Sequence, residues 1–160
     1  MRYKDVKNII RKHIDNHKPA AVISTGVSSI ATDICVERVA INVGSANGGP
    51  NFGYERLDQV LNQKGPVAYW STLPIRSIVK AIENDGIPAH ISNSAGTQGC
   101  NLVFYYLMDY VAEKELGIPA GFIHVPRLPE NVFGSRNPSM SLTHSARALE
   151  KAVIVVTSNL

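Results

Sequence analysis

Residues 91–101 have the sequence ISNSAGTQGCN, and this segment decides the fold. The apolar run 87–91 that leads into it is short, as expected of a buried strand. Residues 92–99 are rich in Ser, Asn and Gly, which predicts a tight turn. The strongly apolar run 102–116 that follows has the length of a helix. A strand, a turn and a helix therefore follow one another, with Cys100 at the start of the helix.

The same alternation extends outward along the chain. Helices are expected at residues 3–17, 71–85, 102–116 and 141–155, and strands at residues 20–24, 34–43, 66–70, 87–91 and 121–125. Ser71 or Thr72 is expected to cap the second helix, with Pro74 in its first turn. Residues 25–32 and 44–65 are expected to form loops, the second of them long. The alternation predicts an α/β fold, a three-layer α/β/α sandwich with a mostly parallel twisted sheet.

Length and composition favour one globular domain over residues 1–160. Hydrophobic residues make up 44% of the chain and charged residues 18%, which is close to the globular average. The net charge is +3 and the sequence holds no block of Lys or Arg, so we expect no nucleic-acid partner. The apolar runs are too short to span a membrane, and the N-terminus does not resemble a signal peptide. We therefore expect a cytoplasmic protein with no membrane partner.

Cys100 has the setting of a nucleophile. The start of a helix presents backbone N–H groups and a partial positive charge, and both stabilise a thiolate. The same N–H groups can bind the oxyanion that forms when a carbonyl is attacked. The alternative is that Cys100 is a small apolar residue that only fills space at a helix start.

His124 and Glu37 are candidates for the remaining catalytic groups. His124 lies near the end of the strand 121–125, where catalytic side chains of parallel sheets gather, and a thiol and an imidazole form a workable nucleophile and base. Glu37 interrupts an otherwise apolar strand, and a buried carboxylate needs a partner such as an imidazolium. Two alternatives remain open: His124 can be satisfied by backbone groups, and Glu37 can pair with Arg38 on an exposed face.

The other cysteine and histidines give no sign of a metal site. Cys35 lacks an activating context and is expected to pack in the core, and both cysteines are expected to be reduced. His13 and His17 can share one helix face, where we expect them to be solvated. The five histidines show no ligand spacing with the cysteines: His13, His17, His90, His124 and His144.

Several segments together resemble the pyroglutamyl peptidase I family, also called pyrrolidone carboxyl peptidases. They are VERVAIN (36–42), AYWSTLP (68–74), GIPAHISNSAG (86–96), Cys100-Asn101, GFIHVP (121–126) and Pro138-Ser139-Met140. The resemblance implies an α/β/α fold and a catalytic triad of Cys100, His124 and Glu37. It also implies removal of N-terminal pyroglutamyl residues from peptides through an acyl-enzyme, no metal or cofactor, and a homo-oligomer (dimer or tetramer). The substrate and the oxyanion would be contacted by residues before and at the start of the helix, namely Asn93, Ser94, Gly96 and Gly99.

The sequence departs from the family pattern at several points. It begins with a helix and lacks the family's first strand and its Gly-Phe-x-Pro-Phe-Gly loop, so the domain is expected to be truncated at its N-terminus relative to the family. Ala31 occupies the position of a family arginine, Gln98 or its neighbour lies where an aromatic residue is usual, and Arg127 replaces a frequent tyrosine. These changes affect the substrate pocket and leave the reactive groups in place.

Three functions are compatible with this sequence. The first is a cysteine peptidase for peptides with an N-terminal pyroglutamyl residue. The second is a catalytically impaired relative that acts as a binding or assembly subunit. The third keeps the thiol chemistry but uses another small amide as its substrate.

Overall fold

The computed structural model describes residues 5–45 and 58–160, and helices and strands alternate along them. The helices are α1 (Val6–His17), α2 (Ile75–Asn84), α3 (Gly99–Glu113), the short 3-10 helix η2 (Pro129–Asn131) and α4 (Leu142–Thr157). The strands are β1 (Val22–Ser28), β2 (Ile34–Glu37), β3 (Val39–Ile41), β4 (Ala68–Trp70), β5 (Ala89–Ser92) and β6 (Ala120–Pro126). None of the helices in the described ranges combines the length and the apolar character needed to cross a bilayer.

Four strands form the central sheet, in the order β1-β6-β2-β5. β1 runs parallel to β6, and β2 runs parallel to β5. β2 and β6 meet antiparallel in the middle of the sheet, where Cys35 lies opposite His124. Two of the three strand interfaces are parallel, so the predicted mostly parallel sheet is confirmed.

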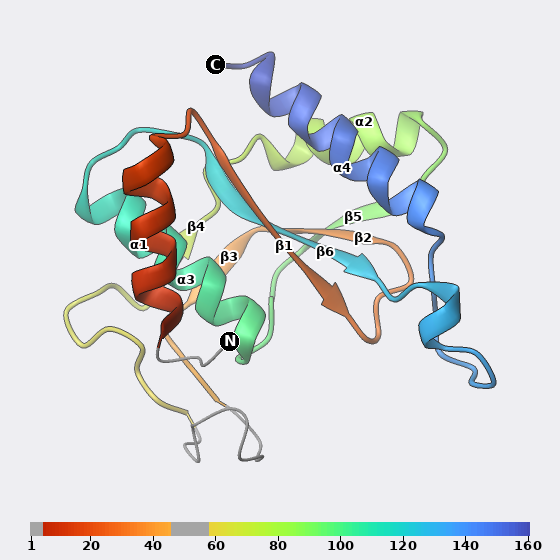
Figure 1. Ribbon diagram of the computed structural model, residues 1–160, viewed down its shortest axis with the longest axis horizontal. Helices are drawn as coiled ribbons and strands as arrows, with labels where there is room; N and C mark the ends of the chain where they lie inside the picture. The colour runs from red at the N-terminus through yellow and green to blue at the C-terminus, as the bar shows by residue number, and fades with distance from the viewer. Residues whose placement is uncertain (1–4, 46–57) are drawn as a thin grey trace.

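Helices cover both faces of this sheet, as Figure 1 shows. α2 and α4 lie on one face, over a core that includes Val36 and Ile123. α1 and α3 lie on the other face, over a core that includes Phe122. Because side chains alternate along a strand, Glu37 and His124 face the α3 side, opposite to their neighbours Val36 and Ile123. The predicted three-layer α/β/α architecture is confirmed.

The strand predicted over residues 34–43 is wrong in one respect, because the structure divides it into β2 and β3, which belong to different sheets. The chain changes partner at Arg38. The N–H of Arg38 donates to the carbonyl of Ser92 at 2.9 Å, beside β5, while its carbonyl accepts the N–H of Ser71 at 2.8 Å, beside β4. β3 then pairs antiparallel with β4 in a two-stranded sheet.

β1 is longer than the strand predicted over residues 20–24. Small and polar residues from position 25 onward predicted a loop, yet β1 continues to Ser28, which lies opposite Pro126. Pairing with β6 along the whole strand outweighs the weak strand propensity of these residues.

The prediction that Ser71 or Thr72 caps α2 is also wrong. Pro74 precedes the helix, and no side chain caps it. The hydroxyls of Ser71 and Thr72 instead donate to the carbonyl of Ala120 at 3.4 and 3.3 Å, and Thr72 Oγ1 also accepts the Ala120 N–H at 2.8 Å. These bonds fasten the segment before α2 to the start of β6.

The remaining elements lie close to their predicted positions. α4 follows Ser141, whose hydroxyl caps the helix by accepting the N–H of His144 at 3.2 Å. In the long loop predicted over residues 44–65, Gly44 and Gln59 form an isolated antiparallel bridge. Residues 46–57 of that loop lie outside the described residues.

Candidate active site

Cys100 lies in the first turn of α3, after the turn that follows β5, and its side chain lines a cavity of about 700 Å³. The N–H of Leu102 donates to the carbonyl of Gln98 at 3.0 Å. The three preceding N–H groups, those of residues 99–101, belong to the set that a helix leaves without intrahelical acceptors. The N-terminal N–H groups of α3 and the positive end of its dipole therefore lie beside the thiol.

Asn101 anchors this helix start to β3. Its side chain is fully buried, with 0% exposure. Its amide oxygen accepts the N–H of Ile41 at 3.0 Å, and its amide nitrogen donates to the carbonyls of Ile41 and Val43 at 2.9 Å each. The neighbour of Cys100 thus fixes the position of the first turn of α3. Sequence reasoning missed this role, although a polar residue at the head of a strongly apolar helix was a signal of it.

His124 and Glu37 meet on the α3 side of the sheet. His124 comes from β6 and Glu37 from β2, and Nδ1 of the imidazole donates to Oε1 of the carboxylate at 2.7 Å. The two residues are 7% and 1% exposed. A carboxylate that is this deeply buried needs such a partner. Glu37 is therefore not part of an exposed pair with Arg38, and His124 is not satisfied by backbone groups alone.

Opposing influences set the pKa of His124. Burial lowers it, because an imidazolium loses hydration in the interior. Hydrogen bonding to Cys100 and to Glu37, together with the charges of both groups, outweighs burial and raises the pKa to about 9. At neutral pH the imidazole therefore carries a second proton and is hydrogen-bonded to Glu37 and Cys100.

Gly26 allows the thiol to approach the sheet. It lies on β1 opposite His124 in the strand register. A Cβ atom at this position would lie 2.9 Å from Sγ of Cys100 and 2.9 Å from Cζ of Phe122, closer than side-chain contacts allow. The absence of a side chain at position 26 thus leaves room for Cys100 above the strand.

The cavity brings most of the predicted site residues together. Cys100, His124 and Glu37 line it, and so do Ser94 and Gly96 from the turn before α3. The other two residues predicted to contact substrate, Asn93 and Gly99, are not among the lining residues. The cavity therefore contains all three candidate catalytic side chains and part of the predicted binding set.

Two apolar residues that line the cavity are open to solvent. Val27 and Ile30 line it with 58% and 83% of their surfaces exposed. Ala31 and Gln98, two of the positions that depart from the family pattern, line it as well.

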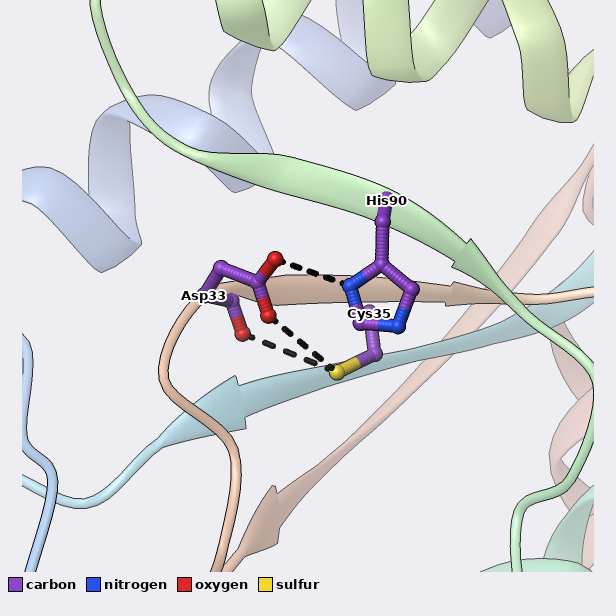
Figure 2. A group of neighbouring side chains, drawn as sticks. All are labelled: Asp33, Cys35 and His90. Atoms are coloured by element: carbon purple, nitrogen blue, oxygen red, sulfur yellow. Dashed lines mark hydrogen bonds and ion pairs between the residues drawn. The ribbon is translucent and has the colours of Figure 1, made fainter.

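A second group of side chains lies in the same cavity, formed by Asp33, Cys35 and His90 (Figure 2). Burial raises the pKa of the Cys35 thiol to about 12, and the nearby carboxylates of Asp33 and Glu37 act in the same direction. No sequence pattern signals this group, because only the parallel register of β2 and β5 sets Cys35 beside His90. Both cysteines of the chain are free thiols.

Comparisons with known proteins show which family the chain resembles. A family model described as pyroglutamyl peptidase matches residues 1–159. A pyrrolidone-carboxylate peptidase of Caldanaerobacter subterraneus is 43% identical over 155 residues, which cover 96% of this chain and 76% of the relative. A pyrrolidone-carboxylate peptidase of Pseudomonas fluorescens is 46% identical over 141 residues, which cover 88% of this chain and 65% of the relative.

Solved structures agree as well. The pyroglutamyl peptidase I of Bacillus amyloliquefaciens superposes with a TM-score of 0.90 at 39% identity, covering 94% of this chain and 71% of the other. The pyrrolidone carboxyl peptidase of Thermococcus litoralis gives a TM-score of 0.93 at 36% identity, covering 98% and 74%. The family model matches nearly the whole chain, the relatives are more than 40% identical to it, and the solved structures share its architecture. The chain therefore belongs to the pyroglutamyl peptidase family.

Proposed function

We propose that this pyroglutamyl-peptidase-like hydrolase cleaves the amide bond after an N-terminal pyroglutamyl residue, with Cys100 as nucleophile, His124 as general acid and base, and Glu37 as the residue that orients His124. The observation that carries the proposal is the buried contact of 2.7 Å between Glu37 and His124 in the cavity that also holds Cys100. The relatives named as pyrrolidone-carboxylate peptidases support the substrate class.

The reaction follows from the protonation of these groups. The Cys100 thiolate attacks the carbonyl carbon that joins the pyroglutamyl residue to the next residue, and it forms a carbon–sulfur bond. The imidazolium of His124 gives its proton to the leaving amine as the carbon–nitrogen bond breaks, which leaves an acyl-enzyme. Neutral His124 then takes a proton from water, whose oxygen attacks the acyl carbon. The carbon–sulfur bond breaks, and pyroglutamate leaves.

The head of α3 stabilises the charge that develops on the substrate oxygen. The N–H groups of residues 99–101 lie at the positive end of the helix dipole, and such donors are worth several kcal/mol, about 3–4 for one oxyanion-hole bond. The turn before α3 would hold the substrate, and the position of Ser94 and Gly96 on the cavity wall supports this role. For Asn93 and Gly99 a contact with substrate stays a prediction.

A fluorogenic pyroglutamyl amide tests this proposal. We expect measurable turnover by the parent protein and none above background for Cys100→Ser or His124→Ala. His144→Ala is the matched control, because His144 is an exposed helix residue and its removal leaves the cavity unchanged. Equal turnover by the parent and Cys100→Ser would exclude the proposed nucleophile.

One observation favours a second candidate, a catalytically impaired relative that serves as a binding or assembly subunit. The apolar side chains of Val27 and Ile30 on the cavity wall are largely exposed, whereas a small lactam needs an enclosed slot to be oriented. This candidate predicts no turnover and equal alkylation of Cys100 and Cys35 by iodoacetamide at neutral pH. The peptidase predicts fast, selective alkylation of Cys100, because the raised pKa keeps Cys35 protonated.

The assembly and location of the protein stay predictions. A homo-oligomer, dimer or tetramer, is expected from the family resemblance, and light scattering of the purified protein measures its mass directly. Fractionation of cells that produce the protein tests the cytoplasmic location.

A further inference from the structure

We propose that Asp33, Cys35 and His90 form a binding site for one thiophilic divalent cation of the zinc class. The site lies in the same cavity as Cys100 but uses none of the three residues assigned to catalysis. The inference concerns metal binding and holds whether or not the protein is an active peptidase.

The three side chains converge from two adjacent strands and the loop between β1 and β2. Cys35 on β2 and His90 on β5 are partners in the parallel register, so their side chains leave the sheet on the same face. Asp33 precedes β2. Figure 2 shows its carboxylate at one side of the thiol and the ring, with an interaction to each. Oδ2 of Asp33 lies 2.8 Å from Nδ1 of His90, and Oδ1 lies 3.9 Å from Sγ of Cys35.

These distances suit a single ion. One ligand atom from each residue lies within 4.8 Å of the other two. Zinc binds sulfur at about 2.3 Å and nitrogen or oxygen at about 2.0–2.2 Å, so tetrahedral ligand atoms are separated by roughly 3.3–3.8 Å. Small side-chain rotations bring the three ligand atoms to these separations. His90 has room to rotate because half of its side chain is exposed.

The donor set selects the class of metal. When a metal ion binds, it displaces the proton of Cys35, which is released to solvent. The resulting set of a thiolate, an imidazole and a carboxylate favours Zn²⁺ or Co²⁺ over Mg²⁺ and Ca²⁺, which prefer oxygen ligands. The carboxylate of Asp33 lies beside the ring of His90 and the thiol of Cys35, and its negative charge favours a cation at this place. Three protein ligands leave a fourth position open for water.

Cobalt is the direct probe of this site, because a cysteine-bound Co²⁺ ion gives a near-ultraviolet sulfur-to-metal charge-transfer band. We would titrate Co²⁺ into Cys100→Ser, so that Cys35 is the only remaining thiol. We expect the band to rise to one equivalent of metal and to disappear on addition of Zn²⁺. Cys35→Ser in the same background should abolish the band, and His90→Ala should raise the Kd for Co²⁺ by at least about tenfold.

Matched variants separate this site from the other possible ligands. In the Cys100→Ser background, His13→Ala removes half of a stacked pair of exposed histidines on α1, and we expect it to leave the band unchanged. Asp33→Asn keeps the size of the side chain and should weaken Zn²⁺ binding, measured by competition with a chromogenic chelator. Circular dichroism checks that each variant is folded.

Two results would overturn the proposal. One is the absence of any charge-transfer band in folded Cys100→Ser; a band in the single variant Cys35→Ser, which keeps Cys100, would then show that the metal binds at the catalytic pair. The other is a Kd that neither His90→Ala nor Asp33→Asn changes, since Cys35 would then bind metal without the proposed partners.

Discussion

Oε1 of Glu37 lies 2.7 Å from Nδ1 of His124, deep in the sheet, and this bond orients the imidazole and contributes to its raised pKa. The second carboxylate oxygen, Oε2, has no hydrogen-bond partner among the described residues. Since a buried carboxylate without full hydrogen bonding is costly, the imidazolium is the main compensation for the charge of Glu37. Replacing either residue therefore leaves the other buried without its partner, and we expect this to destabilise the fold.

Glu37→Gln tests the charge of this pair without changing its shape. The amide oxygen of the variant side chain can still accept from Nδ1 of His124, but the imidazolium loses its counter-charge. We expect kcat on a pyroglutamyl reporter to fall by about 10²- to 10⁴-fold with a smaller change in KM. Glu130→Gln, an exposed change in η2, is the control. A kcat equal to that of the parent would show that Glu37 has no part in orienting His124.

The protonation of His124 predicts how stability and activity depend on pH. Its pKa is raised from an ordinary 6.5 to about 9 in the folded protein. Between pH 6.5 and 9 the folded protein therefore keeps a proton on His124 that the unfolded chain has released. The contribution of His124 to the free energy of unfolding is therefore fully present below pH 6.5 and is lost as the pH rises through 9. Peptidase activity should fall over the upper part of the same range, because the leaving amine loses its proton donor.

Nuclear magnetic resonance of the His124 ring measures this pKa directly. Hydrogen bonding to Cys100 is the strongest of the influences that raise it, so Cys100→Ser should lower the pKa of His124. Urea unfolding across the same pH range gives the stability. A His124 pKa that is unchanged in Cys100→Ser would contradict the contact between thiol and imidazole.

Local patterns located two of the candidate catalytic residues, which lie on recognisable elements. Cys100 follows a turn at the head of an apolar run, and His124 lies near the end of an apolar strand, so each position depends on a few neighbouring residues. The alternation of such runs also predicted the layered fold. Short apolar segments bounded by turn residues form the helices and strands that the local sequence predicts.

The local patterns did not predict which strands pair or in which register. The role of Glu37 depends on β2 lying between β6 and β5, and the meeting of Cys35 with His90 depends on the exact pairing of two strands. The division of one predicted strand at Arg38 has the same origin, because hydrogen bonds to Ser92 and Ser71 draw its two sides into different sheets. Each of these features is decided by residues distant in the chain.

Asn101→Ala should destabilise the fold and displace the nucleophile. It removes three buried hydrogen bonds and leaves the N–H of Ile41 and the carbonyls of Ile41 and Val43 without the Asn101 side chain. We expect the free energy of unfolding to fall by about 2–4 kcal/mol, because a buried polar group without a partner costs about 1–3 kcal/mol. Urea unfolding measures it, with the exposed Asn159→Ala as control. A loss below that of the control would show that the anchor is not needed.

Gly26→Ala should impair catalysis by moving the thiol. The added methyl group would lie 2.9 Å from Sγ of Cys100 and from the Phe122 ring, and neither a short cysteine side chain nor a buried ring moves away easily. We expect kcat/KM to fall by about tenfold or more, since small displacements of reacting groups are costly, with a modest loss of stability. Thr25→Ala, the exposed neighbour on the same strand, is the control and should change neither. If Gly26→Ala keeps the parent kcat/KM and alkylation rate of Cys100, the thiol does not occupy the space above position 26 during the reaction.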